Sequence, residues 1–132
     1  MIEVREQPEE SLTPARGYEP VILHRNDFVL LTDDIEVWIG RIGDISLFEA
    51  CRNKTLVHFP DGKLLIRRSL SDCERRLDRS MFFRASRRYI VNLSHVQRLH
   101  YEEGVLVFLF KDGRGVALSR RQGTIFRKTR DL

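Results

Sequence analysis

The sequence predicts a mostly β domain with one or two short helices. From Val21 onward, short apolar runs alternate with clusters of turn-forming residues, a spacing typical of all-β domains. Glycine-containing turn signals at 61–62, 102–104 and 111–113 each follow a β-compatible run, which predicts three hairpins. A single internal segment, residues 68–80, breaks this pattern and favours a helix.

The chain has 132 residues, the size of one ordinary domain. Residues 1–20 hold three of the four prolines and few large apolar side chains, which predicts a flexible N-terminal tail. The folded domain is therefore expected to span residues 21–132.

Six apolar runs follow the predicted tail, and each is compatible with a strand. They cover residues 21–27, 28–34, 35–44, 45–53, 54–62 and 63–68. Asp61-Gly62 stands between two of these runs, and an Asp-Gly pair in this position is a strong signal for a tight hairpin.

The segment after these runs has the features of a short amphipathic helix. Leu70, Cys73 and Leu77 recur at a spacing that places them on one helical face, and Ser69 is suited to cap the start, with Asp72 in the first turn.

A further strand is predicted over residues 89–94, where side chains alternate in polarity, and residues 84–88 form the loop leading into it. The apolar run 105–110 and the segment 115–119 predict the last strands. Residues 120–132 favour a second short helix, against which the low helix propensity of Gly123 counts.

Positive charge is concentrated in the C-terminal part of the chain. Residues 79–132 hold 12 Lys/Arg and 4 Asp/Glu, a net charge of +8, whereas residues 1–78 hold 11 Lys/Arg and 15 Asp/Glu, a net charge of −4. Such a field suggests an anionic polymer as partner, and it also fits a solvated surface or an acidic protein partner.

Several classes of protein are disfavoured by the sequence. No apolar run approaches the roughly 20 residues of a membrane span, and no secretory signal is present, so a cytoplasmic location is expected. Cys51 and Cys73 lack a C-x-x-C spacing and the four histidines are scattered, so neither a metal site nor a cofactor is expected. No catalytic motif is present, so the chain is not expected to be an enzyme.

Three segments carry side chains suited to DNA. Residues 84–88 (RASRR) and 118–123 (LSRRQG) each hold two or more arginines, and 51–55 (CRNKT) adds a basic turn. Arginine pairs bidentately with guanine and also binds phosphate, and Gln122 is suited to adenine. The alternative is that these arginines only solvate edge strands.

Four blocks follow one another along the chain: DISLFEA (44–50), RRSLSDCERRL (67–77), FFRASRRYIVNLSHVQRL (82–99) and VALSRR (116–121). Their order and spacing resemble the LytTR DNA-binding domain over about residues 26–132. The resemblance implies an elongated antiparallel β domain that inserts loops into successive major grooves of DNA and uses no recognition helix.

The resemblance also implies site residues. Base contacts are expected from Asn53, Lys54, Ser86, Arg87 and Arg121. Phosphate contacts are expected from Arg84, Arg88, Ser119 and Arg120, with Arg52 and Gln122 of the same loops added to this group. Asn92 is expected to be a structural hydrogen-bonding residue. Ser86 stands where the family usually has His, and Arg88 where it often has Ser. These two differences affect which bases the segment 84–88 would prefer.

The leading hypothesis is therefore a bacterial, sequence-specific regulator of transcription that binds double-stranded DNA, with two copies on a tandem repeat site, and that affects RNA polymerase indirectly. Relatives usually carry a receiver domain before this one, which residues 1–20 are too short to form. We expect either a stand-alone regulator with a separate signalling or membrane partner, or a fragment of a longer chain. The alternative hypothesis is a basic protein-interaction module that docks an acidic partner.

Overall fold

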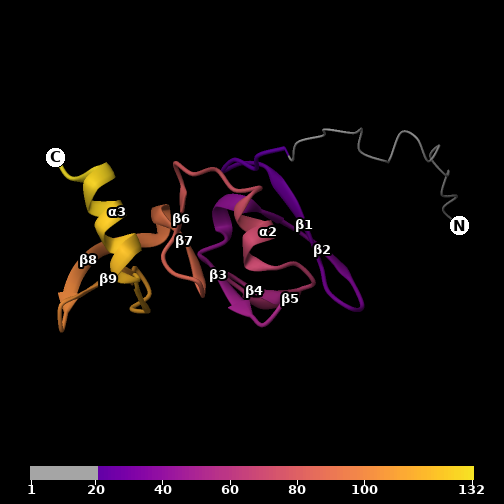
Figure 1. Cartoon of the computed structure of the whole chain (residues 1–132). Helices are drawn as coiled ribbons and strands as arrows, with labels where there is room; N and C mark the ends of the chain where they lie inside the picture. The colour runs from indigo at the N-terminus through magenta and orange to yellow at the C-terminus, as the bar shows by residue number, and fades with distance from the viewer. Residues whose placement is uncertain (1–20) are drawn as a thin grey trace, which may run out of the picture.

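A computed structural model describes residues 21–132, so the tail predicted for residues 1–20 lies outside the described residues. Three antiparallel sheets follow one another along the molecule, with the β1–β2 hairpin at one end and α3 at the other (Figure 1). The predicted elongated, mostly β fold with two short helices is confirmed.

The chain order explains this arrangement, because each sheet is built largely from hairpins. The first sheet is β1 (Phe28–Thr32) and β2 (Val37–Arg41). The central sheet has the order β5 (Gly62–Ile66), β4 (Lys54–Phe59), β3 (Leu47–Cys51), β7 (Tyr89–Asn92) and β6 (Phe82–Arg84). The third sheet has the order β10 (Gly115–Ala117), β9 (Val105–Phe110) and β8 (Val96–Glu102). Helices α2 (Leu70–Glu74) and α3 (Arg120–Arg130) and the 3-10 turns η1 (Ile42–Asp44) and η2 (Leu93–His95) complete the fold.

The three predicted hairpins are present. Phe59 pairs with Gly62, so the first turn is Pro60-Asp61, one residue earlier than the Asp-Gly pair indicates. Glu103 and Gly104 both have left-handed φ angles, 52° and 81°, as a two-residue hairpin turn requires.

Both predicted helices are present and each begins at a serine cap, but α2 ends at Glu74, so Leu77, predicted on its apolar face, lies after the helix. The Ser69 hydroxyl accepts a hydrogen bond from the Asp72 backbone N–H at 3.1 Å, and the Ser119 hydroxyl accepts one from the Gln122 backbone N–H at 3.2 Å. Helix α3 forms despite Gly123 because tertiary packing outweighs its propensity cost.

Two sequence-based expectations were wrong. Residues 21–27 contain no regular strand, only an isolated bridge between Leu23 and Leu77. The strand predicted over 89–94 ends at Asn92, because its side-chain oxygen accepts a hydrogen bond from the Ser94 backbone N–H at 3.0 Å and so starts the 3-10 turn η2.

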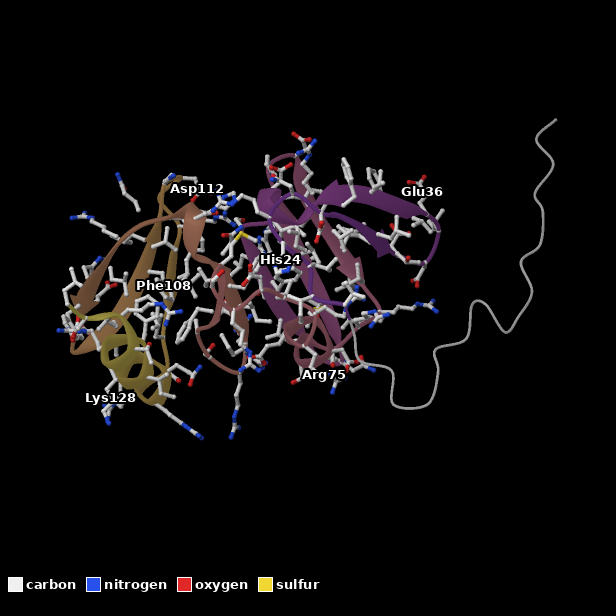
Figure 2. The ribbon with its side chains drawn as sticks, turned by 90° about the horizontal axis from the view of Figure 1, so that it is seen from above. His24, Glu36, Arg75, Phe108, Asp112 and Lys128 are labelled. Carbon is white, nitrogen blue, oxygen red and sulfur yellow. The ribbon has the colours of Figure 1, made fainter. Side chains whose placement is uncertain are left out.

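The central sheet separates two hydrophobic clusters. Phe48 and Ile90 face the cluster that lies between this sheet and α2, whereas Leu47 and Val91 face the cluster under β9 and α3. In Figure 2, Phe108 lies inside this second part of the molecule, and its ring is fully buried.

Aromatic packing attaches α3 to the second cluster. The ring of Phe126 lies 4.8 Å from that of Phe83 and 5.2 Å from that of Phe108, centroid to centroid, in edge-to-face geometry.

Residues 21–132 include no helix that is both long and apolar enough to span a lipid bilayer.

Candidate nucleic-acid interface

The structure brings the three predicted basic segments together. We call residues 52–54 the first loop, residues 85–88 the second loop and residues 119–122 the third loop. Glu49 is paired with Tyr89 in the β3–β7 ladder, so the first and second loops leave the central sheet at the same end. The Ala50 backbone N–H donates to the Arg88 carbonyl at 2.7 Å beside them.

Two hydrogen bonds join the third loop to the second loop and to the adjacent end of β6. The backbone N–H of Ser119 donates to the carbonyl of Ala85 at 2.9 Å, and the Gln122 side-chain amide donates to the carbonyl of Arg84 at 2.6 Å. The beginning of α3 is therefore fixed directly against β6 and the second loop, and the three loops form one contiguous surface.

The first loop consists of the two-residue turn Arg52-Asn53 and Lys54, the first residue of β4, which is paired with Cys51. Arg52 has a left-handed φ of 60°, a conformation that tight hairpin turns require in at least one position. Arg52 and Asn53 are exposed, and Lys54 is half-buried.

The guanidinium of Arg84, the last residue of β6, holds the second loop in place through hydrogen bonds. Its Nε donates to the carbonyl of Ser86 at 2.6 Å and its Nη2 to that of Arg87 at 2.9 Å. Nη1 contacts Glu74 of α2 at 2.8 Å, and the Arg84 side chain is only 19% exposed. This guanidinium is therefore engaged with the protein, whereas a phosphate contact is expected from the sequence.

The remaining side chains of the second loop divide between the loop and solvent. The Ser86 hydroxyl accepts from the Arg88 backbone N–H at 3.1 Å, which tightens the turn. Arg88 lies over the Tyr89 ring at 5.6 Å and reaches Glu49 at 3.4 Å. Arg87 is exposed and has no carboxylate partner among residues 21–132.

The third loop combines a helix start with two free cations. Ser119 caps α3, and Gln122 binds Arg84 as described. Arg120 and Arg121 are exposed in the first turn of α3, and neither forms an ion pair within the described part of the chain. A positively charged surface with exposed guanidinium groups is suited to a polyanion.

The family model of the LytTr DNA-binding domain matches residues 36–130 of this sequence, which include all three loops. The chain belongs to the LytTR DNA-binding domain family. Its function class is therefore DNA binding, and the double helix is the partner that the family match supports.

A solved LytTR structure shares the fold. It is the LytTr DNA-binding domain of a Bacillus cereus protein described as a methyl-accepting/DNA response regulator, with a TM-score of 0.71 and 23% identity. The match covers 80% of this chain and 97% of that one. Among curated proteins, none matches the chain.

Behind the loops of this LytTR domain lies a polar network that sequence reasoning missed. Glu49 accepts from Arg88 and also contacts Nε2 of His58 at 3.0 Å. On the other side of the ring, Nδ1 of His58 lies 3.3 Å from Nη1 of Arg114. Arg114 also donates to the Ser46 hydroxyl at 2.9 Å, so the network crosses from the central sheet to the β9–β10 turn.

The environment of His58 favours a neutral ring. Desolvation by burial is the main cause that lowers the pKa of His58 from 6.5, and hydrogen bonding to Glu49 opposes it. Because Nδ1 faces a guanidinium donor, the single proton of the neutral ring is assigned to Nε2, where it points to Glu49.

The residues predicted from the sequence thus all lie on or beside the contiguous surface. They differ in how exposed they are and in whether they are hydrogen-bonded within the domain. Those exposed to solvent are Arg52, Asn53, Arg87, Arg88, Ser119, Arg120 and Arg121. Ser86, Arg84 and Gln122 are half-buried and make hydrogen bonds within the domain. The expected base and phosphate contacts remain predictions. Asn92, predicted to be structural, is buried and donates to the Ile45 carbonyl at 2.8 Å.

Proposed function

We propose that this LytTR domain is a sequence-specific regulator of transcription that reads the major grooves of double-stranded DNA with its three loops. The observation that carries the proposal is the contiguity of the loops, which presents the free guanidinium groups of Arg87 and Arg121 on one surface. Free guanidinium groups on a fixed backbone can pair bidentately with guanine.

We assign roles according to how free each side chain is. Arg87 and Arg121 are the principal base-contacting residues, with Asn53, Lys54 and Ser86 beside them. Arg52, Arg88, Ser119 and Arg120 bind phosphate. Arg84 and Gln122 are positioning residues, because their donors hold the second loop and the start of α3.

We further propose that two copies bind a tandem repeat site, and that the effect on RNA polymerase is indirect. One domain offers a small surface, and a second copy on the adjacent repeat adds affinity through a doubled set of contacts. A separate signalling or membrane protein is the proposed source of control.

Selection from a random duplex library, followed by gel shifts of the enriched pool in a salt series, tests this function. We expect a short motif repeated about one helical turn apart. Six to ten phosphate contacts would reduce affinity about a thousandfold or more between about 50 and 200 mM salt. Salt-sensitive binding without an enriched motif would exclude specific readout.

The alternative, a basic module that docks an acidic protein, rests on the same exposed arginines. Competition distinguishes the two functions. A DNA reader is displaced by duplex DNA and resists polyglutamate at equal charge concentration. Displacement by both polymers at equal charge would favour the protein-docking module.

A further inference from the structure

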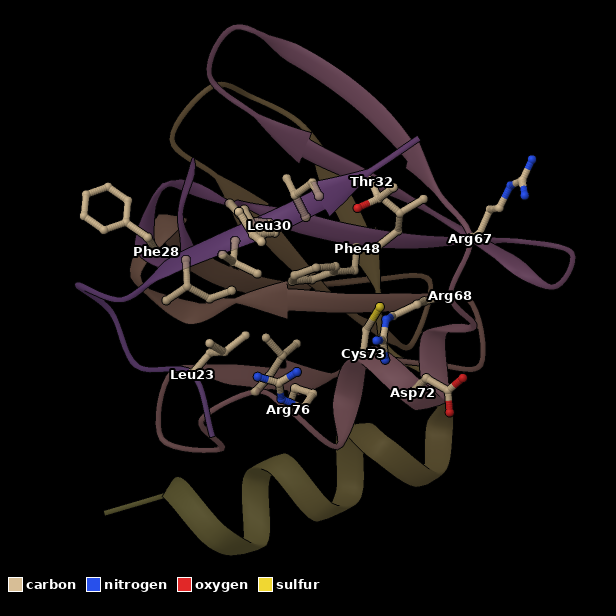
Figure 3. Close-up of a pocket in the computed structure, with 16 residues that line it drawn as sticks. Leu23, Phe28, Leu30, Thr32, Phe48, Arg67, Arg68, Asp72, Cys73 and Arg76 are labelled. Atoms are coloured by element: carbon tan, nitrogen blue, oxygen red, sulfur yellow. The ribbon is translucent and has the colours of Figure 1, made fainter. Parts of the chain in front are cut away.

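A cavity of about 540 Å³ lies between the β1–β2 hairpin, the central sheet and α2, away from the three loops (Figure 3). It exists because β1 is not hydrogen-bonded to the central sheet, so the hairpin covers the sheet without joining it. Its volume falls within the range of small-molecule sites, about 300–1,000 Å³.

The interior of the cavity is apolar. Leu31 comes from the hairpin, Phe48 and Ile66 from the central sheet, and Cys73 and Leu77 from α2 and the residues after it. All five are buried members of one hydrophobic cluster, so a ligand there would contact the core itself. This lining suits a hydrocarbon or aromatic body.

The rim of the cavity is basic. Arg68 lies beside Cys73 and Arg76 beside Leu23 (Figure 3). Neither arginine forms an ion pair within residues 21–132, although Arg76 donates to the Val21 carbonyl at 2.7 Å.

Two other charged residues at the cavity are already compensated. Asp72 pairs with Arg75, which lies outside the lining, and Arg67 pairs with Asp34 at the hairpin tip. Among the described residues, the uncompensated charge at the rim is therefore positive and belongs to Arg68 and Arg76.

We propose that this cavity binds an amphipathic anion, a molecule with an apolar body and one carboxylate or phosphate head group. The body fills the space against Phe48, Ile66 and Leu77, and the head group pairs with Arg68 and Arg76 at the rim. A guanidinium is the donor best suited to either oxyanion.

The cavity is also connected to the second loop. Cys73 lines the cavity, and its neighbour Glu74 holds Arg84, which in turn holds the carbonyls of Ser86 and Arg87. A ligand that shifts α2 therefore changes the position of the second loop. Such a chain of contacts gives an effector a physical route to the loops.

Titration with dodecanoate and with dodecyl phosphate, in the absence of DNA and below micelle formation, tests the site. Trp38, the single tryptophan, pairs with the lining residue Leu31 and reports binding by its fluorescence. We expect saturable one-to-one binding of at least one of the two anions. Which one binds more tightly identifies the head group. Dodecanol and dodecyltrimethylammonium should bind at least tenfold more weakly, because they lack the anion.

Substitutions at the rim and in the third loop test where on the protein the anion binds. We expect Arg68→Gln and Arg76→Gln each to weaken anion binding about tenfold, as loss of a charge-assisted hydrogen bond does. Arg121→Gln removes the same charge from the third loop and should leave the affinity unchanged. Non-saturable binding, equal binding of the alcohol, or weakening by Arg121→Gln alone would overturn the proposed site.

Amide chemical shifts test the connection to the second loop without DNA. We expect dodecanoate, or the anion that binds more tightly, to shift the Ser86 and Arg87 amide signals in the wild-type protein and not in Glu74→Gln. Saturable binding with unshifted second-loop signals would leave the site in place and refute the connection. Neither readout depends on DNA binding, so failure of the proposed function would be recognised separately.

Discussion

Glu74 on α2 and Arg84 on β6 form a hydrogen-bonded ion pair of 2.8 Å between Oε1 and Nη1. The other two nitrogens of the same guanidinium hold the carbonyls of Ser86 and Arg87, so one side chain connects a helix to two consecutive peptide groups of the second loop. The loop conformation therefore depends on a carboxylate outside the basic surface.

The substitution Glu74→Gln separates two roles for Arg84. If Arg84 positions the second loop, the loss of the ionic partner loosens the loop and lowers specific DNA affinity severalfold, in line with about 1 kcal/mol for a partly exposed pair. If Arg84 bound phosphate, release from Glu74 would raise affinity. Fluorescence anisotropy with the selected duplex shows whether the substitution lowers or raises DNA affinity. Asp72→Asn, which removes the same charge from the same helix, is the matched control.

Arg87→Ala and Arg121→Ala are expected to cost about 1–3 kcal/mol each for the preferred site and less for unrelated duplex DNA, because base contacts discriminate and phosphate contacts do not. Gel shifts on both duplexes give the two losses. Arg98→Ala, an exposed arginine on β8 outside the loops, should have a small effect on both. Equal losses on both duplexes would show that Arg87 and Arg121 bind phosphate.

Ser119 has a structural role that can be separated from DNA contact. Ser119→Ala removes the α3 cap and should lower the free energy of unfolding by about 1 kcal/mol in urea titrations. Ser119→Asp keeps a capping oxygen, so stability should be retained, while the added negative charge on the exposed surface weakens binding to any duplex. An aspartate variant as unstable as the alanine variant would contradict the capping role.

Stability should fall in mildly acidic solution because of His58. Burial lowers its folded-state pKa below the usual 6.5, so between that pKa and 6.5 the unfolded chain binds more protons than the folded one. The free energy of unfolding therefore increases with pH in this window and levels off above about pH 7. His58→Gln, which still offers a donor to Glu49, should have a smaller slope in urea titrations. An identical slope would assign the effect to another group.

Much of the fold was predictable because its signals are local. The Asp61-Gly62 pair and the glycines at 104 and 113 mark hairpins, and Ser69 marks the start of α2 with side chains only three residues away. Residues 21–27 have the composition of a strand, but they form only the isolated bridge between Leu23 and Leu77. The composition of a run does not show whether a strand lies beside it to pair with.

The basic segments of the candidate site were also predictable from the sequence, but their internal bonds were not. Glu74 is ten residues from Arg84 and Glu49 is 39 residues from Arg88, so neither ion pair follows a helical or hairpin spacing. Gln122 is suited to adenine by its amide, yet it binds a carbonyl 38 residues away. Only the folded arrangement shows which donors remain free.

The central sheet has a consequence for folding. Phe82 and Phe83 are consecutive residues of β6, yet they belong to different hydrophobic clusters, as do Leu47 and Phe48 on β3. Neither cluster can open without disturbing strands that the other needs, so the two cores melt as one cooperative unit. A core substitution far from the loops then reduces the population of molecules in which the loops are correctly placed. Such a variant binds DNA less well even though every arginine of the surface is intact.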